Sequence, residues 1–149
     1  MTDAPHGPEL RLLVPMDGSA SSTRALGALI RQMGLYKDGV EIHLLNVQHA
    51  LSSHAAAHVG TDVVPEYHRE QGLAELKAGR EMLEAGKIPH QFHIAVGEPA
   101  EVITRYAADH ACDQIVMGTR GMGAVSNLML GSVANKVIHL SSVPVLLMK

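Results

Sequence analysis

Short apolar runs alternate with amphipathic segments along almost the whole chain. The runs lie at residues 10–15, 40–47, 90–96, 114–117 and 143–148, and turn-forming residues border them, as expected of buried β-strands. Strands that alternate with helices are typical of a parallel sheet with right-handed crossovers and helices on both faces. The pattern therefore predicts an α/β domain built on an open parallel sheet of five strands.

Four segments between these runs have apolar residues at helical spacing. The first ends at about Met33, before Gly34, and has three candidate N-cap residues, Ser19, Ser21 and Ser22. The others are predicted at 64–85, from Pro99 to about residue 110, and at 131–139. Gly86 is expected to end the second of them.

The length of 149 residues fits one domain, and a chain of this size buries roughly 68 to 70% of its unfolded surface. Residues 10–149 are predicted to form that domain. Residues 1–9 are polar and contain two prolines, so they are predicted to be a flexible tail rather than a secretion signal. No apolar stretch approaches the length of a membrane span, and the protein is expected in the cytoplasm.

Composition argues against several partners. The formal net charge is only −3, no basic stripe is present, and the chain has three Tyr, one Phe and no Trp, so neither duplex nor single-stranded nucleic acid is an expected ligand. Cys112 is the single cysteine, which excludes an internal disulfide and fits a reducing compartment. We expect it to be a small buried residue.

Glycines are spaced unusually after the fourth strand. Residues 116–121 read VMGTRG, and Gly131-Ser132 follows, which gives the pattern G-x2-G-x9-G-S. Glycines allow neighbouring N–H groups to converge on an anion, and a helix that begins near Gly131 or Ser132 presents amides without intrahelical partners. The motif predicts a phosphate site. The alternative is that the glycines only turn the chain and Ser132 only caps the helix.

Asp17 follows the first strand and is the second candidate for ligand binding. Ligands of open α/β sheets bind beyond the carboxyl ends of strands where the strand order reverses, so Asp17 would face the glycine loop if the first and fourth strands are neighbours. Its carboxylate would repel phosphate, so Asp17 is expected to bind the ribose end of a nucleotide or to hold a divalent ion, and the ribose is favoured. The alternative is a purely structural role in the turn. Arg120 either contacts phosphate or is solvated.

Histidines are numerous, with 10 in the chain, but they do not predict a metal site. His54 and His58 would share one helical face, yet their neighbours are mostly alanine, and the nearest carboxylates follow only at Asp62 and Glu66. His49 lies in the same connection. Two more histidines, His43 and His93, lie on strands and are expected to be packed rather than catalytic. Asp113 is expected to order the turn into the fourth strand.

Four segments together resemble the universal stress protein family, in particular its ATP-binding branch. They are VPMDGSASS, IVMGTRG, GSVANKV and SVPVLLMK, and the resemblance extends over nearly the whole chain from Leu10 onward. It implies a flavodoxin-like, Rossmann-like sheet of order 3-2-1-4-5. In that order the first and fourth strands are neighbours.

The resemblance also implies a role for each motif position. Asp17 would bind the ribose or adenine end, with Pro15 and Met16 lining the same mouth, and the backbone of Val47 would bind adenine. Met117 would pack beside the nucleoside. The phosphates would be held by Gly118, Gly121, Gly131, Ser132 and Val133, with Arg120 as a further candidate. The implied cofactor is ATP or another adenine nucleotide, with or without Mg²⁺ or Mn²⁺.

Members of this family commonly pair through their last strands. The last strand here is apolar, and an exposed apolar edge favours self-association, so a homodimer is predicted. The residues concerned are Val143, Val145, Leu146 and Leu147. The alternative is a monomer whose last strand is covered by its own helix.

The function predicted from these features is regulatory nucleotide binding with little or no turnover. The chain has no G-x4-G-K-[ST] loop, Lys136 is the only lysine near the motif, and no catalytic residue is assigned. One alternative is an enzyme that uses the same site, either a slow ATPase or a phosphoryl- or adenylyl-transferase. Another is a structural subunit with an empty site. The sequence identifies neither the nucleotide nor a downstream partner.

Overall fold

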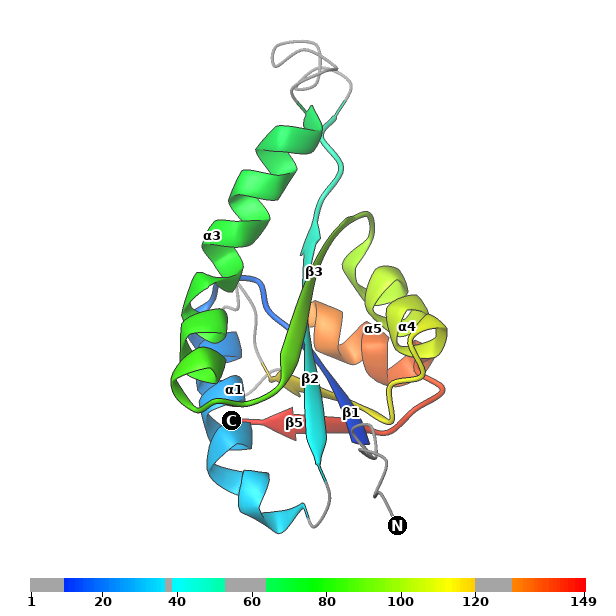
Figure 1. Ribbon diagram of the computed structural model, residues 1–149. Coiled ribbons are helices and arrows are strands. Elements are labelled where there is room, and N and C mark those ends of the chain that lie inside the picture. The colour runs from blue at the N-terminus through cyan, green and yellow to red at the C-terminus, as the bar shows by residue number, and fades with distance from the viewer. Residues whose placement is uncertain (1–9, 37–38, 53–63, 120–129) are drawn as a thin grey trace, which may run out of the picture.

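The computed structural model describes residues 10–36, 39–52, 64–119 and 130–149. Five parallel strands form one sheet in the order β3-β2-β1-β4-β5, as the resemblance implied (Figure 1). The strands are β1 (Leu10–Pro15), β2 (Val40–Gln48), β3 (His90–Val96), β4 (Gln114–Gly118) and β5 (Val145–Met148). The helices are α1 (Ala20–Gln32), the 3-10 turn η1 (Met33–Leu35), α3 (Val64–Ala85), α4 (Pro99–Asp109) and α5 (Ser132–Leu140).

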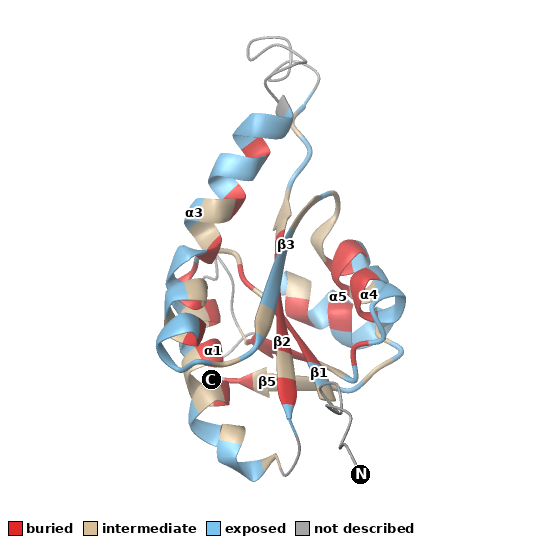
Figure 2. Cartoon of the chain, viewed as in Figure 1, coloured by how far each residue is buried: buried red, intermediate tan, exposed pale blue. Residues whose placement is uncertain are grey.

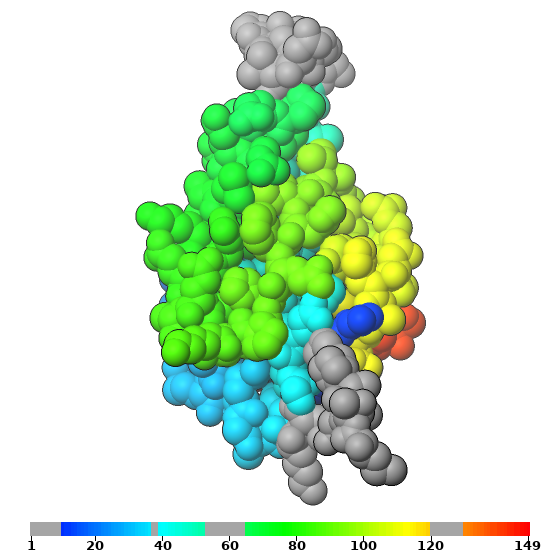
Figure 3. Space-filling view, in the orientation of Figure 1, coloured from blue at the N-terminus to red at the C-terminus, as the bar shows by residue number. Residues whose placement is uncertain are grey.

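Helices cover both faces of this sheet. In Figure 1, α1 and α3 lie on one side of the strands, and α4 and α5 lie on the other. Figure 3 looks onto the β3 edge, where α3 (green) and α4 (yellow) flank the strand. The described part of the chain contains no helix with the length and apolar character needed to cross a membrane.

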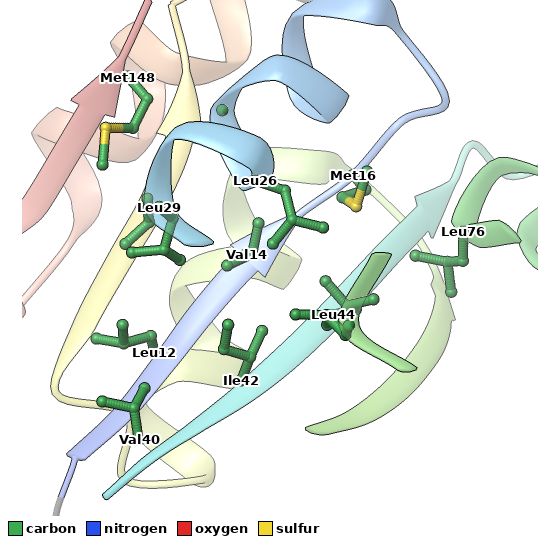
Figure 4. Packing of buried hydrophobic residues seen from close by; sticks show 13 residues of the cluster. Leu12, Val14, Met16, Leu26, Leu29, Val40, Ile42, Leu44, Leu76 and Met148 are labelled. Carbon is green, nitrogen blue, oxygen red and sulfur yellow. The ribbon is translucent and has the colours of Figure 1, made fainter. Parts of the chain in front are cut away.

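Two hydrophobic clusters follow from the alternation of side chains along the strands. Leu12 and Val14 point to the α1/α3 face, whereas Leu13 between them points to the α4/α5 face. The first cluster is drawn in Figure 4 and includes Leu12, Val14, Met16, Leu26, Leu29, Ile42, Leu44, Leu76 and Met148. The second includes Leu13, Leu45, Ile103, Tyr106, Ile115, Met117 and Val137. Burial on both faces explains why the central strands are apolar throughout.

The helices are amphipathic, so each buries one stripe and exposes the rest (Figure 2). On α3, Leu76 and Leu83 are fully buried, while Glu84 and Lys77 are exposed. Gly72 and Gly79 weaken the helical propensity of this segment, but both are buried. A Cβ at Gly72 would lie 2.7 Å from Ile94, so the glycine allows α3 to approach β3 closely.

Several boundaries differ from those expected, most by one residue. Helix α1 ends at Gln32 with Met33 as its C-cap, close to the predicted end at about Met33. Gly34 does not end the helical path, because η1 follows and ends at Leu35, capped by Tyr36, whose amide donates to the Met33 carbonyl. Strand β5 begins at Val145 rather than Val143, since the Val143 amide donates to the hydroxyl of Ser141. The last helix is Ser132–Leu140, where 131–139 was predicted with a start near Gly131 or Ser132, and Gly131 is its N-cap.

Candidate functional site

The two candidate loops lie at neighbouring strand ends, because β1 pairs with β4 in parallel. Gly118, the last residue of β4, packs directly against the start of α1. A Cβ at this position would lie 2.7 Å from Ser21 Oγ and 3.1 Å from the Ser21 carbonyl oxygen. The end of β4 and the start of α1 are therefore side by side, as the ligand hypothesis required.

Asp17 forms a turn between β1 and α1. Its Oδ1 accepts a hydrogen bond from the Ser19 amide at 2.9 Å, and the Ser19 hydroxyl caps α1 by accepting from the Ser22 amide at 3.1 Å. Gly18, between them, has φ of +80°, a conformation that favours glycine. Asp17 therefore stabilises the turn, which is the structural role predicted from the sequence as the alternative. A half-buried carboxylate at this position is also at the mouth of the predicted site.

The beginning of α5 lies against the end of β4. The Gly131 amide donates to the Thr119 carbonyl at 2.7 Å, which brings the two ends of the glycine motif together. Gly131 is the N-cap residue of α5 and has no side chain with which to satisfy the amides of the first turn. The caps of α1 and α4 differ, since Ser19 and Glu98 each accept such an amide. Ser132, the first helical residue, is exposed.

The remaining predicted positions lie at or near the ends of β1, β2 and β4 and at the start of α5. The side chains of Met16 and Met117 are only 2% and 7% exposed and belong to the two hydrophobic clusters, so mainly the backbone of Met16 is at the strand end. Val47 and Val133 pack against the second cluster. Pro15 is partly buried at the end of β1.

A polar network at the end of β2 was not predicted from the sequence. Asn46 Nδ2 donates to the Met16 carbonyl at 2.9 Å and to Glu75 Oε2 at 2.6 Å, and Asn46 is fully buried. Gln48 Nε2 donates to Asn46 Oδ1 at 2.7 Å and to the same Glu75 oxygen at 3.1 Å. A polar residue inside an apolar run, as Asn46 is, could have indicated a buried hydrogen-bond network. Nothing in the sequence identified Glu75 as its partner.

Several predicted positions lie outside the described residues. Arg120 and Gly121 of the glycine motif do, and so do His54, His58 and the tail at residues 1–9. His49 is described and exposed. Within the four described ranges, no group of three or more His, Cys, Asp or Glu side chains could hold a metal ion.

Other side chains were expected to be structural. His43 and His93 were both predicted to be packed. The prediction is correct for His43, which is 3% exposed, and wrong for His93, which is exposed. Cys112 is buried as expected, and this burial raises the pKa of its thiol to about 11. Asp113 orders the entry into β4, since its carboxylate accepts from the Arg11 amide at 2.7 Å. Lys136 reaches from α5 to Glu98 at the start of α4, 3.3 Å away.

Comparisons with known proteins agree with this architecture. The sequence profile of the universal stress protein family matches residues 10–149. Universal stress protein YxiE of Bacillus subtilis is 31% identical over an alignment of 148 residues, and the match covers 93% of this chain and 98% of YxiE. The match thus spans both loops of the candidate site.

Solved structures share the fold. The structure of MJ0577, a protein of Methanocaldococcus jannaschii, superposes with a TM-score of 0.78 at 27% identity and covers 94% of this chain and 95% of its own. An Arabidopsis thaliana universal stress protein with AMP bound has a TM-score of 0.66 at 21% identity and covers 94% of this chain and 91% of its own. Sequence, topology and strand order lead to one conclusion: the chain belongs to the universal stress protein family.

Proposed function

We propose that this chain is a regulatory protein that binds an adenine nucleotide, ATP foremost, between the ends of β1 and β4. The observation that carries the proposal is the uncapped beginning of α5, which the hydrogen bond from Gly131 to Thr119 holds beside the end of β4. First-turn amides that receive no cap from a side chain of Gly131, together with the helix dipole, favour an anion there. Gly118, Gly131, Ser132 and Val133 would contact the phosphates, together with Gly121 and Arg120.

The backbone conformation of Gly131 supports this assignment. Its φ of −60° and ψ of 152° are accessible to any residue, so the fold does not need glycine here for its backbone. A serine or aspartate would cap α5 better than glycine does. An absent side chain at this position is what phosphate binding requires.

The ribose and adenine would lie at the other end of the crevice. Asp17 would bind the ribose, with Pro15 and Met16 beside it, and the backbone of Val47 would bind adenine. Met117 would pack near the nucleoside. A carboxylate at one end and uncapped amides at the other give the crevice a polarity that matches a nucleotide, in which only one end is anionic. Mg²⁺ or Mn²⁺ would accompany the phosphates. The Arabidopsis relative with bound AMP supports an adenine nucleotide.

Binding with little turnover is part of the proposal. Fast phosphoryl transfer needs a cation placed at the developing charge and a residue that orients the nucleophile. Lys136, the lysine nearest to the motif, is 60% exposed and its ammonium group lies 3.3 Å from Glu98 Oε1. Nucleotide occupancy would act by shifting the population between two states of the protein.

We further propose a cytoplasmic homodimer that pairs through β5. Residues 10–149 would be the single folded domain of each subunit and residues 1–9 a flexible tail. Strand β5 is an edge strand whose Val145, Leu146 and Leu147 are only half-buried in the single chain, and Val143 precedes it. A second copy would cover this apolar edge.

The test is a substitution that lets α5 cap itself. In Gly131→Asp, the new carboxylate would accept the first-turn amides and repel phosphate, so ATP affinity should fall at least about tenfold, while thermal stability stays equal or rises slightly. Calorimetric titration of nucleotide-stripped protein with ATP, AMP and cAMP measures the affinities. Thermal unfolding measures the stability.

The matched control is Gly39→Asp, which makes the same change in charge at an exposed glycine where an added Cβ would meet no heavy atom within 4 Å. It should bind ATP as the wild type does. Wild-type protein that binds no adenine nucleotide, or a Gly131→Asp variant that binds ATP as tightly as the wild type, would contradict the proposal.

A further inference from the structure

We infer that Glu75 of α3 is a positioning residue for the nucleotide site, because through Asn46 it fixes the peptide that leads into Asp17. The inference rests on the proposed function and deepens it. It assigns the ribose end of the site a support that lies on a different element and 58 positions further along the sequence than Asp17.

Strand β2 holds Met16 on both sides of its backbone. The Met16 amide donates to the Leu45 carbonyl at 2.9 Å, and the Met16 carbonyl accepts from Asn46 Nδ2, also at 2.9 Å. The Met16 carbonyl and the Asp17 amide belong to one planar peptide unit, so fixing the carbonyl fixes the direction in which the chain enters the turn. Asn46 therefore determines where the Asp17 backbone begins.

Glu75 in turn holds Asn46. A primary amide has two N–H donors, and those of Asn46 reach the Met16 carbonyl and Glu75 Oε2. Gln48 completes the network by donating to both Asn46 Oδ1 and Glu75 Oε2. Asn46 is fully buried next to the apolar cluster formed by residues such as Leu44 and Leu76, where an unsatisfied amide would be costly. Loss of Glu75 would leave one donor of Asn46 without its partner and favour a different rotamer.

Helix α3 also packs directly on the turn. A Cβ at Gly18 would lie 3.0 Å from Glu75 Cγ, and a Cβ at Gly79, one helical turn along, would collide with the sulfur of Met16. Glu75 thus contacts the turn through its aliphatic carbons while its carboxylate holds the turn from the side of β2. Both contacts bear on the residues around Asp17 and neither bears on α5.

The geometry makes a specific statement about the chemistry required at position 75. Both amide donors converge on a single oxygen, Oε2, at 2.6 and 3.1 Å. The carbonyl oxygen of a glutamine side chain can accept two hydrogen bonds in the same way. Hydrogen bonding, and not the negative charge, is therefore the function of Glu75, and Glu75→Gln should preserve it.

The experiment compares three ligands on four proteins. Calorimetric titrations with ATP, adenosine and tripolyphosphate would use the wild type, Glu75→Ala, Glu75→Gln and the control Glu84→Ala, an exposed glutamate on the same helix. Glu75→Ala should bind ATP and adenosine about fivefold or more weakly, and tripolyphosphate within about twofold of the wild type. Glu75→Gln and Glu84→Ala should match the wild type within about twofold for all three ligands. Without ligand, amide hydrogen exchange at residues 16–19 should be faster in Glu75→Ala alone.

Each contrary result has a distinct meaning. Wild-type protein that binds ATP, with Glu75→Ala equal to it for adenosine, would overturn this inference and leave the proposed function standing. Equal losses for adenosine and tripolyphosphate, or a Glu75→Gln variant as weak as Glu75→Ala, would overturn it as well. Wild-type protein that binds none of the three ligands would overturn the proposed function and this inference together.

Discussion

The absence of a side chain at Gly118 sets how closely the end of β4 approaches the start of α1. A methyl group there would meet the Ser21 hydroxyl at 2.7 Å and the Ser21 backbone oxygen at 3.1 Å. The hydroxyl can rotate away, but the backbone of the first turn of α1 cannot. The close approach is therefore a property of this residue rather than of the sheet.

We expect Gly118→Ala to lower the free energy of unfolding by about 1 to 3 kcal/mol, the usual cost of overpacking. Gly27→Ala is the matched control, since that glycine is inside α1 and its methyl group would meet only Met82 Cε at 3.4 Å and an Arg31 nitrogen at 3.6 Å. It should stabilise the protein by up to about 1 kcal/mol through helix propensity. Urea unfolding of the three proteins measures both effects, and equal stability of Gly118→Ala and the wild type would contradict the packing argument.

His43 is the buried histidine in a group of aromatic and charged side chains between β2 and α4. Its Nδ1 lies 3.0 Å from the Tyr106 hydroxyl, and Tyr106 stacks on His110 with ring centroids 3.7 Å apart. Its Nε2 lies 3.2 Å from Glu41 Oε1 but is not aligned for a hydrogen bond. Burial lowers the pKa of His43 below 6.5, and the opposing effect of the Glu41 carboxylate is smaller. His110 and Arg11 also lower this pKa.

The protein should therefore lose stability on mild acidification. Because the His43 pKa is lower in the folded state, the unfolded state binds more protons between the two pKa values, so the loss begins as the pH falls through about 6.5 and grows until the folded pKa is reached. Melting temperatures from pH 8 to pH 5 measure it. His43→Gln should flatten this dependence, whereas His139→Gln, at an exposed residue of α5, should leave it unchanged. Parallel pH profiles for the wild type and His43→Gln would show that other groups cause the loss.

At the scale of elements, sequence patterns predicted what is decided locally. The bounds of α3 and β1 agree with prediction, because a long amphipathic period and a bounded apolar run leave few alternatives. The hydrogen bond between Asn46 and Glu75 joins residues 29 positions apart. It depends on how α3 packs against the sheet, and no local sequence pattern encodes that packing. The uncapped start of α5 was predicted only as a choice between Gly131 and Ser132. The comparisons establish the strand order that the resemblance implied, but the roles of the individual site residues stay predictions.

The contact between α4 and α5 yields a prediction about catalysis. Lys136 of α5 and Glu98 of α4 form an exposed ion pair, and such pairs contribute at most about 1 kcal/mol to stability. If Lys136 serves this contact and not phosphoryl transfer, Lys136→Ala should leave ATP affinity within about twofold of the wild type, and any ATP hydrolysis that the wild type shows should be unchanged. A phosphate-release assay together with calorimetric titration would check this. A tenfold loss of hydrolysis at unchanged affinity would instead favour the enzyme alternative.

For the whole molecule, the two edges of the sheet differ in what covers them. Strand β3 forms one edge and is flanked by α3 and α4 (Figure 3), with Val96 47% exposed near its end. Strand β5 forms the other edge and consists of four residues, three of them half-buried and apolar. Ile138 and Leu140 of the neighbouring α5 are 42% and 52% exposed. Pairing of β5 with a second copy would bury the half-buried apolar side chains of this edge.

Val145→Lys should convert the proposed dimer to a monomer, because a charged side chain on an edge strand opposes strand pairing between subunits. Val96→Lys is the matched control, since it places the same charge on the opposite edge strand and should leave the dimer intact. Light scattering coupled to size exclusion measures the mass, which should be twice 15.9 kDa for the wild type and Val96→Lys, and 15.9 kDa for Val145→Lys. Circular dichroism of each variant would establish that the fold is retained. A wild-type mass of 15.9 kDa, or a dimer lost in Val96→Lys but kept in Val145→Lys, would contradict pairing through β5, because the edge that self-associates must be the one that the charge disrupts.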